Sequence, residues 1–361
     1  MRNFLDAQKD RTLHHDQLPQ TSWSRRPFTF VVCADTQLGM TNANREWETE
    51  LAYARHAVNQ INALHPRPAF CCCCGDLVDM EYTFYIHKGF TKQECDDIQD
   101  QQNRDFQSVW SELHEDIAMV CLCGNHDLGN RPTRSSIERF TGAFGDDYLA
   151  FWAHGTYNIV LNTTLFSDPS GAMELYEHQL EWLESRLRYA QEQNASLVFV
   201  FGHHPWFLYH DEEEKDDLSG VIPYPVEWNM PGAGGFPDYY FHIPKPFRTR
   251  VMELFAQYQV DAAFSGHFHQ NLVSKASFGM DMIITSSLSM VFNSTGKPAK
   301  DNALDEPSGV RGIRIVDVKV GEGSGTGSFS HWFLPLQEGS SFASTTSHPP
   351  AVVKSSEDMS T

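Results

Sequence analysis

Cys121-Leu122-Cys123-Gly124-Asn125-His126-Asp127 is an apolar run that stops at a glycine and three polar residues. A short apolar run bounded by turn residues is typical of a buried strand. In α/β proteins, ligands gather at the carboxyl ends of the strands. The stretch therefore predicts a strand that carries the polar side chains of residues 125–127 to a functional site at its tip.

Four other stretches repeat this pattern of a buried strand followed by polar residues. They are Phe30-Val31-Val32-Cys33-Ala34-Asp35, Cys71-Cys72-Cys73-Cys74-Gly75-Asp76, Phe199-Val200-Phe201-Gly202-His203-His204 and Ala262-Ala263-Phe264-Ser265-Gly266-His267-Phe268-His269. A glycine or small residue precedes the polar groups, which lets the backbone segments approach closely. We expect the five tips to come together in one place.

Helices are predicted between these strands. Residues 47–64 carry apolar side chains at alternating steps of four and three, which is the period of an amphipathic helix. Residues 106–117, 180–190 and 251–258 predict further helices, whereas residues 81–101 lack an apolar period and are interpreted as irregular. The alternation of strands and helices is typical of βαβ units.

The C-terminal part of the chain has a different pattern. Strands predicted at 281–285, 312–318 and 327–333 follow one another without helices, which favours antiparallel pairing. Two mixed sheets packed face to face, with helices on the outside, accommodate both patterns. The predicted fold class is therefore α/β, with four layers in which a sandwich of two sheets is flanked by helices.

A single domain is predicted over residues 26–335. Residues 1–25 are polar and are interpreted as a flexible N-terminal arm, and residues 336–361 as a disordered tail rich in Ser, Thr and Pro. Residues 208–246 break the alternation of strands and helices. They predict a long loop, which in compact domains often serves as a lid.

Charge and composition argue against several kinds of partner. A net charge of −20 over 361 residues disfavours nucleic acid, because nucleic-acid binders usually carry a basic face. The sequence has no apolar run long enough to span a membrane and no apolar leader, so we expect a cytoplasmic protein without a membrane partner. Its eight cysteines are then expected to remain thiols. The sequence leaves the oligomeric state open.

Side chains at the five tips have the chemistry of metal ligands. A single histidine in such a position is more often a satisfied core or surface residue. Carboxylate, imidazole and amide groups together bind divalent metals such as Mn, Fe or Zn, so five tips of this kind predict a metal site. The candidate site residues are Asp35, Gln37, Asp76, Asp79, Asn125, His126, His203, His204, His267 and His269.

The order and character of these residues resemble the calcineurin-like metallophosphoesterases. The resemblance rests on Asp35-x-Gln37, Gly75-Asp76-x-x-Asp79, Gly124-Asn125-His126-Asp127, Gly202-His203 and Gly266-His267-x-His269. Within the family it is strongest to a group of serine/threonine phosphatases, through Gly145-Asp146-Asp147-Tyr148, His203-x-Pro205 and Asp238-Tyr239-Tyr240-Phe241. It covers roughly residues 28–320 and implies the calcineurin-like metallophosphoesterase fold.

The resemblance also implies a centre of two divalent metal ions, which would be Mn, Fe, Zn or Mg. Asp76 would bridge the two ions. The further ligands would be Asp35, Gln37 and His269 for the first ion and Asn125, His203 and His267 for the second.

The activity that the resemblance implies is hydrolysis of phosphomonoesters by a protein serine/threonine phosphatase. A metal-bound hydroxide would attack the phosphorus, and His126 would act as general acid toward the leaving oxygen. Asp79 would hold the other nitrogen of His126, which orients the ring and keeps it protonated. The implied partner is a phosphoprotein or a small phosphoester substrate.

Two residues depart from the family pattern. Gln37 stands where the family commonly has a histidine, and it offers only a neutral amide oxygen, so the first ion is expected to bind weakly. Met80 stands where the protein phosphatases of the family carry an arginine that grips the phosphate. Arg131, Arg45 or a residue of the 208–246 loop must do that work.

Two alternative functions stay open at this stage. The same metals support a phosphodiesterase that acts on cyclic nucleotides or other small diesters. Gln37 and Met80 also allow a binding or scaffold protein of the same fold with little catalytic activity. The presence of both His126 and Asp79 favours an enzyme, because a scaffold has no use for a general acid and the group that orients it.

Strand alternation and turn chemistry give two smaller expectations. Cys33, Cys74 and Cys123 each precede a candidate ligand by two residues, so the three thiols are predicted on the same sheet face as their ligands. Asp127 is expected to hold its turn by accepting hydrogen bonds from backbone amides.

Overall fold

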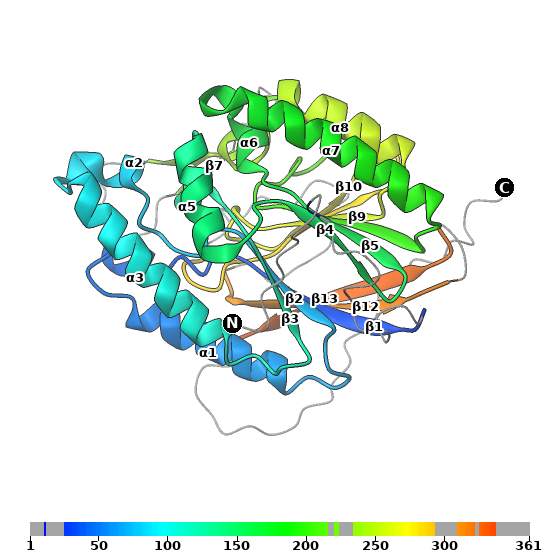
Figure 1. Cartoon of the computed structure of the whole chain (residues 1–361), viewed down its shortest axis with the longest axis horizontal. Coiled ribbons are helices and arrows are strands. Elements are labelled where there is room, and N and C mark those ends of the chain that lie inside the picture. The colour runs from blue at the N-terminus through cyan, green and yellow to red at the C-terminus, as the bar shows by residue number, and fades with distance from the viewer. Residues whose placement is uncertain are drawn as a thin grey trace.

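Two β-sheets lie face to face in the computed structural model, which describes residues 11, 25–215, 220–223, 234–292, 309–321 and 325–336. Helices cover the outer face of each sheet, so that the described chain forms four layers (Figure 1). The predicted α/β sandwich is confirmed. None of the helices in these ranges combines the length and apolarity needed to cross a bilayer.

The first sheet combines parallel and antiparallel strands in the order β13-β12-β1-β2-β3. The central strands are parallel, and the two C-terminal strands pair antiparallel at one edge. The strands are β1 (Phe28–Cys33), β2 (Phe70–Cys74), β3 (Ala118–Leu122), β12 (Gly312–Lys319) and β13 (Ser328–Pro335).

The second sheet has the order β10-β11-β9-β6-β5-β4. Its strands are β4 (Leu149–Ala153), β5 (Thr156–Val160), β6 (Leu197–Phe201), β9 (Ala262–Ser265), β10 (Leu272–Lys275) and β11 (Asp281–Ile284). The expectation of antiparallel pairing is confirmed for β12 and β13, whereas β11 pairs antiparallel with β10 on one side and parallel with β9 on the other. The chain reverses at β10 and again at β11, so β11 regains the direction of β9.

Each outer face is covered by its own helices. The helices over the first sheet are α1 (Glu48–Asn62), α3 (Lys92–Trp110) and α5 (Arg134–Phe144), and those over the second are α7 (Met173–Glu192) and α8 (Lys245–Gln257). Shorter elements are α2 (Tyr82–Tyr85), α4 (Asn125–Leu128), α6 (Thr164–Ser167) and the 3-10 turns η3 (Met40–Asn42), η4 (Ile86–Lys88), η5 (Pro169–Gly171) and η8 (Asp238–Phe241).

The interpretation of residues 81–101 as irregular is wrong. Helix α3 begins at Lys92 behind a capping box, in which Thr91 accepts a hydrogen bond from the amide of Glu94 and the Glu94 carboxylate accepts one in return. The buried positions in the first half of α3 include Gln99, Gln102 and Asn103, so the sequence shows no apolar period there. The helix ends at Trp110, earlier than predicted.

The predicted 208–246 loop contains a small hairpin in the part that the structure describes. Strand β7 (Val221–Pro223) pairs antiparallel with β8 (Gly235–Pro237), and η8 follows. Residues 216–219 and 224–233 lie outside the described residues. The same holds for the arm apart from Arg11 and Arg25, and for the tail beyond Leu336. The domain boundaries and the lid stay predictions.

The three cysteines predicted to share one sheet face do not. Strand pairing sets Cys33 opposite Cys73, so Cys74 points to the other face of the sheet. Cys33 and Cys123 pack beneath the helices, whereas Cys74 packs between the sheets. All eight cysteines are buried, and none forms a disulfide.

A cluster of aromatic side chains fills the space between the sheets. The Phe30 ring stacks on Phe70, with ring centroids 4.7 Å apart, and meets Phe264 edge-on at 5.5 Å. Both partners of Phe30 come from other strands, one in each sheet. The side chain is fully buried. Phe30 therefore joins the two sheets that carry the strand tips.

Replacing Phe30 by alanine is expected to lower the free energy of unfolding by about 3–5 kcal/mol, because it leaves a cavity in this cluster. Ile86→Ala is the control: the side chain is 44% exposed, and its loss should cost no more than about 0.5 kcal/mol. Urea unfolding followed by circular dichroism measures both. A loss below about 1 kcal/mol for Phe30→Ala would show that the cluster does not hold the sheets together.

Candidate metal centre

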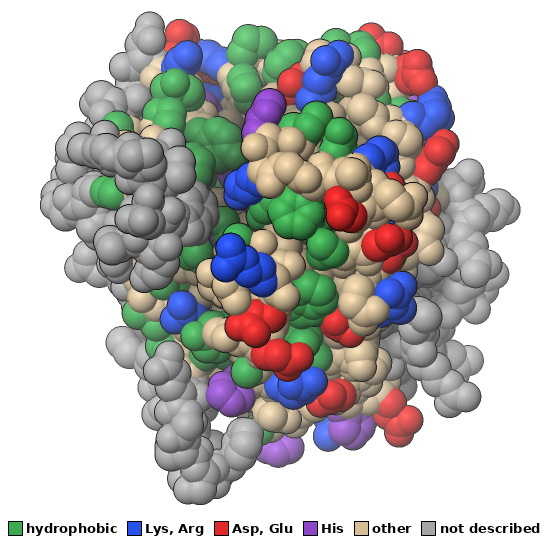
Figure 2. Space-filling view, turned by 90° about the vertical axis from the view of Figure 1, so that its left-hand side faces the viewer, with side chains coloured by type: hydrophobic (Ala, Val, Ile, Leu, Met, Phe, Trp, Pro, Cys, Tyr) green, Lys and Arg blue, Asp and Glu red, His purple; other side chains and the backbone are tan. Residues whose placement is uncertain are grey.

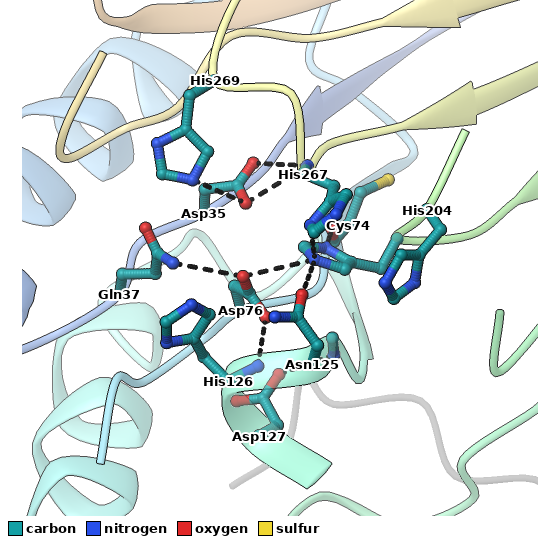
Figure 3. Close-up of polar contacts among 12 residues, drawn as sticks. Asp35, Gln37, Cys74, Asp76, Asn125, His126, Asp127, His204, His267 and His269 are labelled. Carbon is teal, nitrogen blue, oxygen red and sulfur yellow. Dashed lines mark hydrogen bonds and ion pairs between the residues drawn. The ribbon is translucent and has the colours of Figure 1, made fainter. Parts of the chain in front are cut away.

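The five predicted strand tips meet at one end of the sandwich (Figure 3). Three come from the first sheet, after β1, β2 and β3, and two from the second, after β6 and β9. Hydrogen bonds cross between the sheets: the amide of His267 donates to the carboxylate of Asp35 at 3.1–3.2 Å. Residues more than 200 positions apart in sequence thus share one buried site.

The ligands predicted for the second ion surround one point. Nε2 of His203 lies 3.0 Å from Oδ1 of Asn125 and 3.1 Å from Nδ1 of His267. It also lies 3.2 Å from Oδ2 of Asp76. Metal–ligand bonds of about 2.0–2.2 Å place neighbouring ligand atoms roughly 3 Å apart. These four side chains therefore fit a single metal ion.

The ligands predicted for the first ion form an adjacent group. Asp35, Asp76 and His269 each offer an atom within 4.8 Å of the others, and Nε2 of His269 is 3.4 Å from Oδ1 of Asp35. The amide nitrogen of Gln37 lies 3.1 Å from Oδ2 of Asp76, and the Gln37 oxygen is buried without a hydrogen-bond partner. The two ends of an amide are assigned from their partners. Rotation of this amide turns the unpartnered oxygen toward the site.

Asp76 is the side chain that the two groups share. Its Oδ2 faces both His203 and Gln37, while its Oδ1 accepts a hydrogen bond of 2.8 Å from the amide of His126. Burial opposes its ionisation, but the imidazoles of His203 and His126 hold the pKa of Asp76 well below its usual range. An ionised carboxylate between the groups is what a bridging ligand requires.

Main-chain carbonyls orient the three imidazoles that are predicted to bind metal. In each ring one nitrogen faces a carbonyl oxygen, which leaves the other nitrogen free to bind a metal. The pairs are His203 Nδ1 with Cys74 O at 2.9 Å, His267 Nε2 with Tyr240 O at 3.4 Å and His269 Nδ1 with Met290 O at 2.6 Å.

The backbone turns sharply where it delivers the ligands. Five site residues have left-handed backbone conformations, which residues other than glycine rarely adopt. Such conformations cost free energy and cluster at functional sites. They are Asp35 (φ 53°), Gln37 (φ 39°), Asp76 (φ 50°), His267 (φ 66°) and His269 (φ 54°).

Two glycines make room for the ligands. A Cβ atom on Gly124 would lie 2.2 Å from Oδ1 of Asp76, and one on Gly75 would lie 2.5 Å from Nδ1 of His203. Gly75 also has a positive φ of 80°. The glycines that precede Asp76 and Asn125 are therefore required by close packing of the tips, as the sequence predicts.

The expected role of Asp127 is confirmed. Its carboxylate accepts hydrogen bonds from the amides of Gly124 at 2.8 Å, Leu77 at 3.1 Å and Val78 at 3.3 Å. Burial and the charge of Asp76 raise the pKa of Asp127 to about 7, although the three amides oppose that shift. Asp127 thus ties the turn after β3 to the turn after β2.

His126 lies beside the ligand groups and is paired with Asp79. Its Nδ1 is 2.8 Å from Oδ1 of Asp79, and its ring stacks on Phe84 with centroids 4.6 Å apart. Burial disfavours the protonated ring, but the carboxylates of Asp76 and Asp79 outweigh burial and raise the pKa of His126 to about 10. The geometry supplies a protonated imidazole at the edge of the predicted metal centre.

Sequence reasoning missed the residues that hold Asp79. Its Oδ2 accepts hydrogen bonds from the Asn44 amide at 2.7 Å and from the Tyr85 hydroxyl. Gln102 in turn donates to Asn44 at 2.6 Å. All four side chains are buried. No local sequence signal identifies Asn44, Tyr85 or Gln102, because their partners are set by the tertiary fold.

His204, a candidate at the tip after β6, is buried and offers an atom within 4.8 Å of atoms of His203 and His267. The His204 ring lies 4.3 Å from the His267 ring and 4.9 Å from that of His203. Burial and the neighbouring His203 hold the pKa of His204 well below its usual value, so the ring is neutral. His242 is also buried, and its Nδ1 lies 2.9 Å from Nη1 of Arg248.

A cavity of about 560 Å³ opens above the site. Besides site residues, its lining includes the aromatic side chains Phe84, Phe236, Tyr240 and Phe292. Of the two arginines proposed to replace the family arginine, Arg45 lines the cavity, whereas Arg131 donates to the carbonyl of Ser170 at 3.2 Å. Met80 itself is fully buried.

The arrangement of ligands at the end of a four-layer sandwich is that of a metallophosphoesterase. A family model for calcineurin-like phosphoesterases matches residues 28–271. The chain is 35% identical over 297 residues to the serine/threonine-protein phosphatase CPPED1 of Danio rerio, which covers 79% of this chain and 83% of that protein. The chain thus belongs to the calcineurin-like phosphoesterase family and is a phosphoric ester hydrolase.

Solved structures share the fold at low sequence identity. A dimetal phosphatase from Danio rerio aligns with a TM-score of 0.52 at 15% identity, over 87% of this chain and 98% of that one. GAP50, the anchor in the inner membrane complex of Plasmodium, aligns with a TM-score of 0.56 at 13% identity, over 87% and 86% of the two chains. At these identities the likeness shows the fold alone.

Gly124→Ala is expected to lower the metal content of the protein to less than half that of the wild type, because the added methyl group displaces Asp76. Gly142→Ala is the matched control, since a Cβ on Gly142 meets nothing within 4 Å. Metal content after loading with Mn²⁺ and desalting is measured by inductively coupled plasma mass spectrometry. Equal metal content in the two folded variants contradicts the proposed crowding at Asp76.

In the metal-free protein, His126 is expected to titrate near pH 10, well above the ordinary value of about 6.5. A raised pKa means that the ring keeps its proton at neutral pH and releases it only as the pH rises through about 10. Asp79→Asn should lower this pKa, because the ion pair is lost. The ring chemical shifts in NMR report both values, and a wild-type pKa below about 7 contradicts the assignment.

Proposed function

We propose that the chain is a dinuclear-metal phosphomonoesterase that removes phosphate from phosphoserine and phosphothreonine in proteins. The observation that carries the proposal is the His126–Asp79 pair, which lies at the edge of two adjacent groups of metal ligands. The name of the Danio rerio relative, a serine/threonine-protein phosphatase, supports the substrate class.

The residues present fit two divalent ions that share Asp76. The oxygen and imidazole donors suit Mn, Fe or Zn, and Mg is a further candidate. When bound, the ions activate a water molecule and neutralise charge on the phosphoryl oxygens. The proposed ligands are Asp35, Gln37, Asp76 and His269 for the first ion, and Asp76, Asn125, His203 and His267 for the second.

His126 is the proposed general acid. Asp79 engages its Nδ1, which leaves Nε2–H to protonate the leaving oxygen of the substrate. Phe84 stacks on one face of the ring and limits its rotation. The buried hydrogen bonds from Asn44 and Tyr85 hold Asp79 in place and leave its second oxygen directed at His126.

A phosphodiesterase and a scaffold are the competing functions. Faster turnover of bis-p-nitrophenyl phosphate than of the monoester would favour the phosphodiesterase. A folded protein that retains two metal ions and hydrolyses neither ester would favour the scaffold. Both outcomes contradict the proposed phosphomonoesterase.

His126→Gln provides the sharpest test, because its effect depends on the leaving group. We expect it to lower turnover of a phosphoserine peptide by about 10²–10⁴-fold, since a serine alkoxide must be protonated as it leaves. The loss on p-nitrophenyl phosphate should be much smaller, because p-nitrophenolate is a stable anion. Steady-state kinetics with Mn²⁺ measures both, and equal losses on the two substrates contradict the role of general acid.

Asp76→Asn and Asp116→Asn are the controls for these assays. Asp76→Asn should remove turnover of both substrates, because both ligand groups lose their shared charge. Asp116→Asn makes the same chemical change at an exposed position and should leave turnover intact.

A further inference from the structure

Two segments meet at one oxygen of Asp79, and each carries a basic side chain to the mouth of the cavity. The first segment contains Asn44, whose side-chain amide donates to Asp79 Oδ2, and the next residue is Arg45. The second contains Tyr85, whose hydroxyl donates to the same oxygen, and Lys88 follows within the adjoining turn η4. Arg45 and Lys88 therefore extend from the two segments whose side chains hold Asp79, the partner of His126.

The segment that carries Arg45 is held by its own hydrogen bonds. The backbone amide of Asn44 donates to the Gly39 carbonyl at 2.8 Å, and the backbone amide of Arg45 donates to the Asn42 carbonyl at 3.1 Å. The amide of Thr41 donates to the buried Glu50 carboxylate at 2.9 Å. The Arg45 side chain is exposed and lines the cavity.

Lys88 is placed by an aromatic contact. Its ammonium group lies 4.4 Å from the centre of the Tyr85 ring, the same ring whose hydroxyl bonds to Asp79. The side chain is exposed and lines the same cavity as Arg45. A cation over an aromatic face gains a modest stabilisation, which favours this placement.

Neither cation forms an ion pair with a carboxylate in the part of the chain that the structure describes. The carboxylates that line the cavity are Asp76 and Asp79, and both have the partners described above. The chain as a whole has a net charge of −20, and acidic side chains lie among the basic ones on the surface shown in Figure 2. Two cations without carboxylate partners are thus available to a ligand at the mouth.

The anchors show which part of a substrate these cations meet. In the proposed reaction the phosphoryl oxygens would lie over the predicted metal ligands, and His126, held by Asp79, would face the leaving group. Because Arg45 and Lys88 extend from the segments that hold Asp79, they flank the leaving group rather than the phosphoryl group. An anion bound there belongs to the chain that carries the phosphate.

We propose that Arg45 and Lys88 form an anion-binding subsite that selects phosphopeptides with acidic side chains next to the phosphorylated residue. The inference rests on the proposed phosphatase function and adds the sequence context of the substrate. Phe84, which stacks on His126 and also lines the cavity, supplies an apolar surface for the backbone and side-chain carbons of such a peptide.

The test compares two phosphoserine peptides that differ only in having Glu or Gln on both sides of the phosphoserine. Wild-type protein loaded with Mn²⁺ should hydrolyse the Glu peptide with a kcat/KM about fivefold higher, mostly through KM, since exposed ion pairs contribute modestly. The preference should shrink in 0.5 M NaCl, because salt screens exposed charges.

The double variant Arg45→Gln/Lys88→Gln should reduce the preference to about onefold by lowering kcat/KM for the Glu peptide. The matched control is Arg55→Gln/Lys319→Gln, which removes the same charge from exposed positions outside the cavity and should retain the preference. Peptide binding to His126→Gln protein, measured by fluorescence anisotropy with and without the Arg45 and Lys88 substitutions, repeats the comparison when turnover is slow.

Three outcomes overturn the subsite. The first is equal loss on both peptides, which would mean that the cations grip the phosphoryl group itself. The second is an unchanged preference in the double variant. The third is a wild-type protein that neither prefers nor binds the Glu peptide more tightly. Failure to hydrolyse any phosphomonoester contradicts the proposed function instead, and the binding comparison still decides the subsite.

Discussion

The carboxylate of Asp76 is the group on which the site depends. It is buried where the tips of β1, β2, β3 and β6 converge, and such a charge is costly unless it is compensated. Backbone amides, imidazoles and the expected cations supply that compensation. The two sheets must therefore end close together around this side chain, and the aromatic cluster at Phe30 holds them there.

Bringing the strand tips this close together requires strained backbone in the turns that follow the strands. Five of the predicted ligand residues have left-handed backbone conformations, and at Gly75 and Gly124 the absence of a side chain leaves room for His203 and Asp76. Asp127 then joins two of these turns through backbone amides. Hydrogen bonds thus tie together the turns that carry the predicted ligands, while the cavity above them is bounded by side chains of separate segments.

Much of the site follows from sequence because strand, glycine and polar tip are adjacent in the chain. Prediction from the sequence fails where the position of a side chain depends on strand register or on contacts between distant segments. Alternation relates a thiol to a ligand two residues later only while the strand continues, and β1 and β2 end at Cys33 and Cys74, before their ligands. The register between these strands places Cys33 and Cys74 on opposite faces of the sheet. The polar first half of α3 hides a helix because it buries amide side chains. Asn44 and Tyr85 reach Asp79 only through the tertiary fold.

The carbonyl groups that orient the three imidazoles predicted as metal ligands have a consequence for divergence within the family. Every amino acid supplies a main-chain carbonyl, so substitutions at Cys74, Tyr240 or Met290 leave these acceptors in place. The orientation of these imidazoles is therefore preserved when the side chains at the supporting positions change. Side chains around the cavity can change their recognition of substrate while the inherited centre below them stays intact.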